Sequence, residues 1–297
     1  MTLQSIDPAP PRVEPNGGRA DTAVNVRSSL AFFAVHLIPL LAFVTGITRT
    51  AIILFVVTYV VRTLAITAGY HRYFAHRAYR LGRVAQFVVA FVGTSAAQKG
   101  PLWWAGHHRT HHRFTDREGD VHSPMRGFWW SHVGWILCDR HKQADRAIIR
   151  DFERFPELRF LDRYDWIAPW TLGVACFLIG GWSGLVVGFF ASTVLLWHAT
   201  FSVNSIAHLI GRRPYATSDM SRNNRAVALL TFGEGWHNNH HRYPKAARQG
   251  FRWWQLDVTF YVLVAFSWVR IVHDLRPVPA VVRAEARRGR TARVSSG

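Results

Sequence analysis

The sequence predicts an all-α membrane protein with four transmembrane helices, arranged as two hairpins, and a polar helical cap rich in histidine. Three observations lead to this fold class. Hydrophobic residues make up 49% of the 297 residues and charged residues only 18%, whereas an average soluble domain has about 25% charged residues. Residues 167–208 contain no Lys, Arg, Asp or Glu. Many of the 16 histidines gather next to apolar segments.

The apolar segments come in two closely spaced pairs. Residues 1–27 have little apolar surface to bury, and we expect a disordered tail without a removable signal peptide. Because about 20 apolar helical residues cross a bilayer, we expect spans at about 28–45, 51–70, 166–180 and 184–203. Short turns join the first two spans and the last two, so each pair forms a hairpin. Residues 28–275 make one domain, and the basic residues 276–297 are expected to form a second disordered tail.

Polar residues at 71–165 and 209–275 form the predicted cap. Within it, the apolar stretch 84–97 is too short to span a bilayer, which predicts a buried or interfacial helix. Residues 251–271 are rich in aromatic side chains and are expected to be amphipathic or membrane-peripheral. Arg62 interrupts the second span, and it should face protein or water because a charge in lipid is costly.

The charge pattern predicts the topology. The chain carries 36 basic and 18 acidic residues, a net charge of +18. Such a surplus can indicate nucleic-acid binding, but no nucleic-acid motif is found, and Arg-rich segments beside apolar spans mark the cytoplasmic face of membrane proteins. Both hairpin turns are nearly uncharged, so both termini and the cap are expected in the cytoplasm. The excess of Arg over Lys favours a bacterial cell membrane.

Four histidine clusters carry the chemistry. The sequence contains two HisXXHisHis boxes and a HisXXXXHis pair, together with an Asn-XXX-His segment. Side chains at i, i+3 and i+4 share one face of a helix, so each box aims three imidazoles into one volume. His71 and His76 diverge by roughly 140° on an ideal helix, so we expect them to serve different metal ions unless the helix loosens there. The clustered residues are His71, His76, His108, His111, His112, Asn204, His208, His237, His240 and His241.

Nine imidazoles exceed the needs of one ion, since zinc takes four ligands and octahedral iron about six. Two metal ions, with Asn204 or a water completing the shell, fit this number. We expect Asp116, Asp120, Glu118 or Glu234 to orient the ring N–H groups. The two cysteines exclude a thiolate site. A di-iron carboxylate bundle would need a second Glu-X-X-His pair. His36, His132, His141, His198 and His273 are each expected to be ordinary surface or core residues, and His122 could support the cluster.

These motifs resemble those of the membrane fatty acyl desaturases, of the stearoyl-CoA and acyl-lipid delta-9 type. Content, order and spacing match at 69–76, 108–112, 127–135, 204–208 and 233–241. The resemblance implies a four-span cone beneath a cytoplasmic cap that holds a di-iron centre. It implies that the nine clustered histidines are the ligands and that Asn204 acts directly or through a water. It also implies a cis double bond, formed near carbon 9 with O2 as co-substrate.

The resemblance leaves the acyl carrier open between CoA, a lipid and a carrier protein. Animal acyl-CoA enzymes have an Arg-Asp pair where this chain has Gly106 and His107. An apolar tunnel would fix the reacting carbon, and its candidate lining residues are Trp103, Trp104, Trp197, Thr200 and Phe201. No dinucleotide fingerprint or cysteine-rich segment is found, so electrons are expected from a separate ferredoxin, cytochrome or flavoprotein reductase, for which exposed Arg would suit an acidic surface.

Two alternatives stay open. A hydroxylase or another oxygenase could use the same scaffold, and a hydroxy acid without an alkene would identify it. A histidine-rich metal transporter would need ligands along a path within the spans, where His36 and His198 are the only histidines. Metal flux without a change in lipid unsaturation would favour the transporter.

Overall fold

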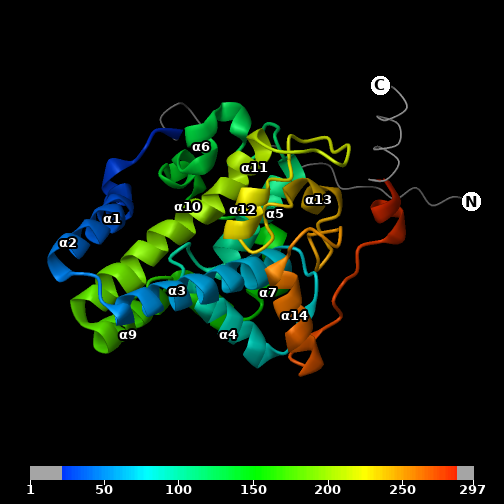
Figure 1. The fold of residues 1–297 in the computed structure, drawn as a ribbon. Coiled ribbons are helices and arrows are strands. Elements are labelled where there is room, and N and C mark those ends of the chain that lie inside the picture. The colour runs from blue at the N-terminus through cyan, green and yellow to red at the C-terminus, as the bar shows by residue number, and fades with distance from the viewer. Residues whose placement is uncertain (1–21, 286–297) are drawn as a thin grey trace, which may run out of the picture.

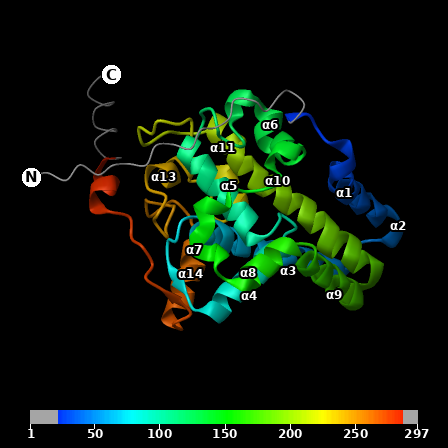
Figure 2. The ribbon, with the colours of Figure 1, turned by 180° about the vertical axis from the view of Figure 1, so that it is seen from behind.

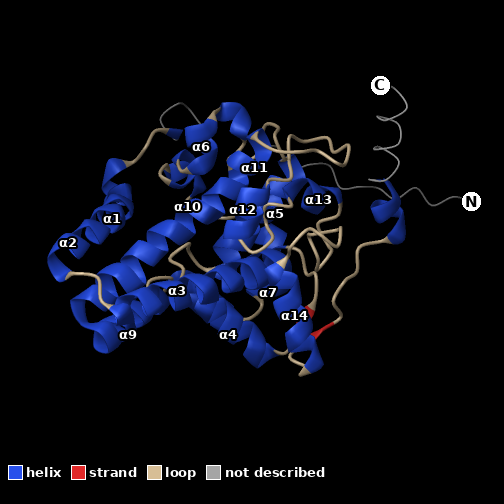
Figure 3. Ribbon diagram, viewed as in Figure 1, coloured by secondary structure: helices blue, strands red, loops and turns tan. Residues whose placement is uncertain are grey.

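A computed structural model describes residues 22–285 of the chain, and these are mostly helical, with long loops between several of the helices (Figure 3). Within this part, three helical stretches are long and apolar enough to cross a membrane by length and composition: Val26–Thr45, Arg49–Ala75 and Ile167–Leu209. The first comprises α1 (Val26–Leu37), η2 (Ile38–Leu41) and α2 (Ala42–Thr45). Asn25 caps it by accepting a hydrogen bond from the backbone N–H of Ser28, which satisfies an otherwise free amide of the first turn.

The second stretch is continuous from the membrane region into the cap. It comprises α3 (Arg49–Leu64) and the π-helix η3 (Ala65–Ala75), and Thr48 caps its start. It therefore runs further than the expected span at 51–70 and carries His71 on its last turns. Arg62 faces protein, as its cost in lipid predicts, and only 1% of its surface is exposed.

The third stretch reverses its direction within the sequence Gly180–Gly184. It comprises α9 (Ile167–Ser183), the π-helix η8 (Gly184–Ala191), α10 (Ser192–Asn204) and α11 (Ile206–Leu209). Gly181 has φ +60° and ψ −153°, a conformation that glycine adopts without the strain of a Cβ. After this reversal a Cβ on Gly173 would lie 3.5 Å from Phe189, so the two arms pack side by side. Figures 1 and 2 show α9 and α10 beside α3, with α1 on the outside of α10.

The cap consists of short helices and loops on one end of these long helices (Figure 1). Its helices are α4 (Arg83–Thr94), α5 (Pro101–Phe114), α6 (Phe128–His132), α7 (Arg150–Glu153), α8 (Pro156–Arg163), α12 (Arg225–Leu230), α13 (His237–Arg242) and α14 (Val258–Trp268). Short 3-10 turns occupy Pro124–Arg126, Gly134–Ile136, Asp139–His141 and Arg146–Ile149. A two-stranded antiparallel pair, β1 (Arg80–Leu81) with β2 (Val272–His273), joins the beginning of the cap to its end.

The main apolar core lies where η3 meets the cap helices. It includes Tyr70 and Phe74 of η3, Leu102 of α5, Phe152 of α7 and Leu161 of α8, each at most 2% exposed. Side chains from these helices interdigitate, so the turn that carries His71 and the helix that carries the 108–112 box are held against each other. This packing holds the histidines in position without a bound ligand.

Both expected tails are partly structured. Residues 1–21 and 286–297 lie outside the described residues, but 22–27 and 276–285 do not. Val24 forms an isolated antiparallel bridge with Cys138, and Val278 and Val282 are buried against Tyr215 and Phe251. These two valines pack in one small apolar cluster, which docks this segment on the cap.

Candidate metal centre

The nine clustered histidines meet in the cap as two neighbouring groups. Candidate ligand atoms within each group lie within 4.8 Å of one another. The first group takes residues from η3 and its end, from α5 and from α13: His71, His76, His108, His112 and His240. The second takes residues from α5, α11 and α13: His111, His208, His237 and His241. The two HisXXHisHis boxes are each shared between the groups, because neighbouring side chains on one helix face point toward different centres.

The expectation that His71 and His76 serve different ions on an ideal helix is wrong. Their rings lie 4.8 Å apart in the same group. The cause is the π-helix, in which the backbone N–H of His76 bonds the carbonyl of His71 at 3.2 Å. An i→i+5 helix turns less per residue than an α-helix and brings residues five apart onto one side. The loosened helix, which the sequence left open as the other possibility, is the observed one.

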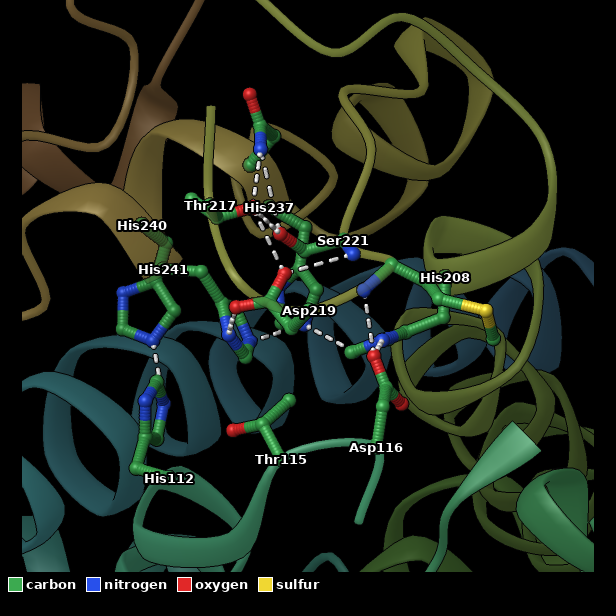
Figure 4. Close-up of polar contacts among 12 residues, drawn as sticks. His112, Thr115, Asp116, His208, Thr217, Asp219, Ser221, His237, His240 and His241 are labelled. Carbon is green, nitrogen blue, oxygen red and sulfur yellow. Dashed lines mark hydrogen bonds and ion pairs between the residues drawn. The ribbon is translucent and has the colours of Figure 1, made fainter. Parts of the chain in front are cut away.

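Buried carboxylates fix the orientation of four of the rings. The Nδ1 of His111 lies 2.9 Å from Asp120, and the Nδ1 of His241 lies 3.0 Å from Asp219. The corresponding distance from His208 to Asp116 is 3.2 Å. Figure 4 shows the pairs of His208 with Asp116 and of His241 with Asp219. A carboxylate that accepts the Nδ1–H selects the tautomer whose Nε2 carries a lone pair for a metal.

The fourth ring, His71, is held by Glu234 through its Nδ1. Glu234 also accepts a 3.0 Å bond from the buried guanidinium of Arg72, which pairs with Asp257 at 2.9 Å as well. Burial raises the pKa of Glu234, but His71 and Arg72 outweigh it and hold the pKa below its usual value. The carboxylate therefore stays ionised and keeps His71 in the tautomer with a free Nε2.

The second group is suited to a cation. Because Nδ1 of His111, His208 and His241 each donates to a carboxylate, their three Nε2 atoms are acceptors. His237 Nε2 lies 3.0 Å from Nε2 of both His208 and His241, and one proton cannot serve two acceptors. The Nε2 of His111 is buried without a hydrogen-bond partner. A cation satisfies all four atoms, whereas an empty cluster leaves buried lone pairs that are costly to desolvate.

The first group shows the same spacing. Its Nε2 atoms lie 2.8 Å apart between His76 and His108, 3.1 Å between His71 and His240, and 2.9 Å between His240 and His112. Two nitrogens that bind one ion at right angles, each at 2.0–2.1 Å, lie about 3 Å apart. The donor set is nitrogen throughout, which suits Fe, Zn, Cu or Ni.

Burial keeps these rings uncharged. It lowers the pKa of His111 to about 3, an effect to which the neighbouring His208 adds. It also places the pKa of His108, His112 and His240 well below the ordinary value, again with help from adjacent rings. Neutral imidazole is the form that binds a metal, so the site is ready for ions near neutral pH.

A cavity of about 560 Å³ runs from the histidines into the region between the long helices. Its size lies within the range of pockets that bind small molecules. His71, His108 and Glu234 line it on the side of the first histidine group. All the residues expected to contact substrate line it too, together with Asn204 at the end of α10: Trp103, Trp104, Trp197, Thr200 and Phe201.

Several contacts at this site were not predicted from the sequence. Asp219 lies in a loop without a periodic pattern, and nothing in the sequence points to its role. The amide of Gln249 lies 3.2 Å from the Nδ1 of His71. His122 stacks on His111 at 4.2 Å and, with Asp120, forms a third group of candidate ligands. Glu118, one of the carboxylates expected to orient a ring, is instead exposed.

Comparison with known proteins finds a family model and relatives that agree on one class of enzyme. A family model described as fatty acid desaturase matches residues 47–273. An sn-1 stearoyl-lipid 9-desaturase from Synechocystis is 36% identical over 85% of this chain and 80% of its own length. Another from Anabaena variabilis is 37% identical over 80% of this chain and 88% of its own. An icosanoyl-CoA 5-desaturase from Limnanthes douglasii is 37% identical over 72% of this chain and 61% of its own.

Proposed function

Because this chain belongs to the fatty acid desaturase family, we propose that it inserts a cis double bond at carbon 9 of a saturated acyl chain, using two iron ions and O2. The observation that carries the proposal is the pair of histidine groups beside an apolar cavity. As ligands we assign the nine clustered histidines, with Asn204 contributing directly or through a water. The reaction removes two hydrogens from the chain, and with two electrons and two protons it reduces O2 to two waters.

Two bound irons would supply the oxidant that an unactivated methylene requires, since no side chain is strong enough. The protein's part is to bind and position the chain and to exclude water. Burial of the chain in the cavity gives about 0.8 kcal/mol per methylene. Trp104, Thr200 and Phe201 lie where they can set which carbon faces the first histidine group, because all three line the same cavity as His71. The carboxylates hold the rings still during turnover.

We place the enzyme in a membrane as a four-span protein with its cap and both termini in the cytoplasm. The reversal at Gly181 supports this number, because it divides the third long stretch into two arms. The acyl chain would be attached to a lipid or to CoA, as in the relatives' names. Electrons would come from a separate ferredoxin, cytochrome or flavoprotein reductase, for which the Arg-rich cap is a suitable surface.

Expression in a host that lacks delta-9 desaturation tests the proposal. The wild-type protein is expected to produce monounsaturated acyl chains. Mass spectrometry of the dimethyl disulfide adducts of these chains should place the double bond at carbon 9. His111→Ala removes one nitrogen of the second group and should abolish the product. His273→Ala, at an exposed position in β2, is the matched control and should retain it. Equal unsaturation with His111→Ala would contradict the metal assignment, and a hydroxy acid without alkene would indicate a hydroxylase.

A further inference from the structure

The lipid-facing wall of the cavity is one helix thick. Phe32 and Val35 of α1 and Trp197 of α10 all line the cavity. The opposite face of α1 is apolar and open, with Leu30 60% and Leu37 63% exposed. Exposed apolar residues on a membrane helix contact lipid. Figures 1 and 2 both place α1 on the outside of α10, and since α1 also lines the cavity, this helix lies between the cavity and the lipid there.

The end of α1 nearest the cap is firmly attached. The Asn25 side chain donates to both carboxylate oxygens of Asp139 at 2.8–2.9 Å, and its backbone N–H donates to the carbonyl of Leu137 at 2.9 Å. The Ser29 hydroxyl adds a 3.3 Å bond to the same carbonyl. Ser29 is also the one residue of α1 that is buried. This end can therefore act as a pivot.

The middle of α1 is held on α10 by ring contacts and one hydrogen bond. The Phe32 ring stacks on Trp197 with centroids 5.3 Å apart and planes inclined by 2°. The Nε2 of His36 lies 3.0 Å from the Nε2 of His198. Among the residues from 22 to 285, this is the one polar contact between α1 and α10. One hydrogen bond and the ring contacts of Phe32 and His36 thus hold the middle of α1 on α10, while Ile38 just beyond α1 packs near Val186 and Val187 of η8.

The hydrogen bond ends a chain of three imidazoles that reaches the cap. His198 Nδ1 lies 2.9 Å from His132 Nε2, and His132 Nδ1 lies 2.9 Å from the hydroxyl of Ser205. Burial, with His198 nearby, lowers the pKa of His132 to about 4, so this ring is neutral near pH 7. The sequence treats His36, His132 and His198 as unrelated ordinary residues, but the fold joins them.

The direction of this chain follows from its outer end. His36 Nδ1 lies 2.7 Å from the carbonyl of Phe32, which can only accept, so a neutral His36 offers Nε2 as an acceptor. His198 then donates to His36 and His132 donates to His198, while the single proton of the Ser205 hydroxyl is shared between His132 Nδ1 at 2.9 Å and the carbonyl of Phe201 at 3.1 Å. When α1 moves outward, the His36 bond to its own helix and the bonds from His198 to Ser205 remain. Only the bond between His36 and His198 breaks.

The cavity itself is suited to hydrocarbon and not to phosphate. Lys99 is the one Lys or Arg among the described residues that line it, and its ammonium is already paired with Asp165 at 3.3 Å. A carrier with several phosphates needs several cations. The polar head of the substrate therefore stays outside the cavity while the acyl chain is inside.

We propose that α1 is a side gate, through which the acyl chain of an intact membrane glycerolipid enters between α1 and α10, with the His36–His198 hydrogen bond as its latch. The proposal rests on the proposed desaturase activity and names its substrate as lipid-linked. A chain still esterified to glycerol can reach the cavity from the bilayer by this route without leaving the membrane.

A reversible cross-link between the two helices tests the gate. His36→Cys with His198→Cys is joined by a short bis-methanethiosulfonate reagent, and the native cysteines are both buried. The metal-loaded protein is placed in vesicles of 1-stearoyl-2-oleoyl-phosphatidylglycerol with reduced ferredoxin. Before cross-linking, the lipid is expected to lose two mass units. Cross-linking should reduce this rate at least tenfold, and dithiothreitol should restore it.

The matched control is Thr50→Cys with Gly180→Cys, which ties α3 to α9 away from the cavity, where a Cβ on Gly180 would lie 3.6 Å from Thr50. Its cross-linking should leave the rate unchanged. An undiminished lipid rate in the cross-linked His36 and His198 variant overturns the gate. Desaturation of stearoyl-CoA but not of the lipid, by the protein without a cross-link, overturns the lipid assignment while the desaturase activity stands. Desaturation of neither substrate overturns the proposed function itself.

Discussion

The Nδ1 of His111 lies 2.9 Å from the Oδ1 of Asp120, and the Nε2 of the same ring is buried without any hydrogen-bond partner. Asp120 also accepts from the backbone N–H groups of Asp116 and His122. These two backbone bonds fix the carboxylate in the position from which it accepts the Nδ1–H of His111. One side of His111 is fully bonded, and the other points its lone pair into the second histidine group.

Asp120→Asn is expected to weaken one metal site and spare the other. An amide can present its NH2 to the ring and select the wrong tautomer, and loss of such a partner costs about 10- to 100-fold in metal affinity. Elemental analysis of purified protein should find close to two metals in the wild type and close to one in the variant. Asp139→Asn, at an exposed carboxylate, is the control. Two retained metals in Asp120→Asn would contradict the role of this bond.

The sequence is informative where a residue's role depends on local spacing. The boxes at 108–112 and 237–241 place their histidines on helix faces, and the charge-free stretch 167–208 marks the third apolar segment. It is less informative where a backbone departs from the common helix. The π-helix Ala65–Ala75 depends on packing of η3 against α5 and α4. No residue within it indicates the wider helical turn that brings His71 and His76 to the same side.

Contacts between segments that are distant in the sequence are also hard to predict. Asp219 meets His241 through a loop with its own internal bonds, and His36 meets His198 across 162 positions. Neither pairing leaves a pattern in the sequence, because Asp219 and His36 each sit alone in their segments. The docking of residues 278–282 is hard to predict for a similar reason, since Val278 and Val282 need the cap surface before they have anything to cover.

The metal-free protein is expected to lose stability as the pH falls below about 6.5, the ordinary value for histidine. Burial lowers the pKa of His107 to about 4 and of His141 to about 3. Between the folded and the unfolded pKa the unfolded chain binds more protons, so the free energy of unfolding rises with pH in this window and falls as pH decreases. Each such ring contributes up to about 1.4 kcal/mol per pH unit.

Thermal unfolding in the presence of a chelator, from pH 7.5 to 5, checks this dependence. The midpoint should fall steadily below pH 6.5, and His107→Gln should make the decline shallower. A midpoint that is constant over this range would show that the buried rings do not control acid stability.

Arg62 is expected to tolerate Met better than Lys. The guanidinium bonds the hydroxyls of Ser192 and Thr193 at 2.6 Å and the carbonyl of Thr58 at 3.0 Å, and no carboxylate pairs with it among residues 22–285. Both hydroxyls also bond carbonyls of their own helix, so Met leaves neither one unpaired. Met also removes the desolvation cost of a buried charge that has no ionic partner. Lys keeps the charge with fewer donors, and the lost bonds cost about 1.5–3 kcal/mol each.

Thermal unfolding of the detergent-solubilised protein measures the difference. Arg62→Met should unfold within a few degrees of the wild type, and Arg62→Lys should unfold well below both. The opposite order would mean that the positive charge itself stabilises the membrane region.

The enzyme is expected to discriminate acyl chains by the methylenes they bury. The cavity is lined by Phe32, Trp197 and Phe189 along its apolar part, and each buried methylene contributes about 0.8 kcal/mol. Stearoyl and palmitoyl chains differ by two methylenes, which corresponds to a ratio of about 15 in kcat/KM if both groups are buried. Val35→Trp fills part of the same cavity and should reduce turnover of the stearoyl chain more than that of the palmitoyl chain. Competition between the two acyl chains on one glycerolipid headgroup, followed by mass spectrometry of the products, measures the ratio directly. Equal kcat/KM for the two chains, unchanged in Val35→Trp, would mean that the chain does not occupy this cavity.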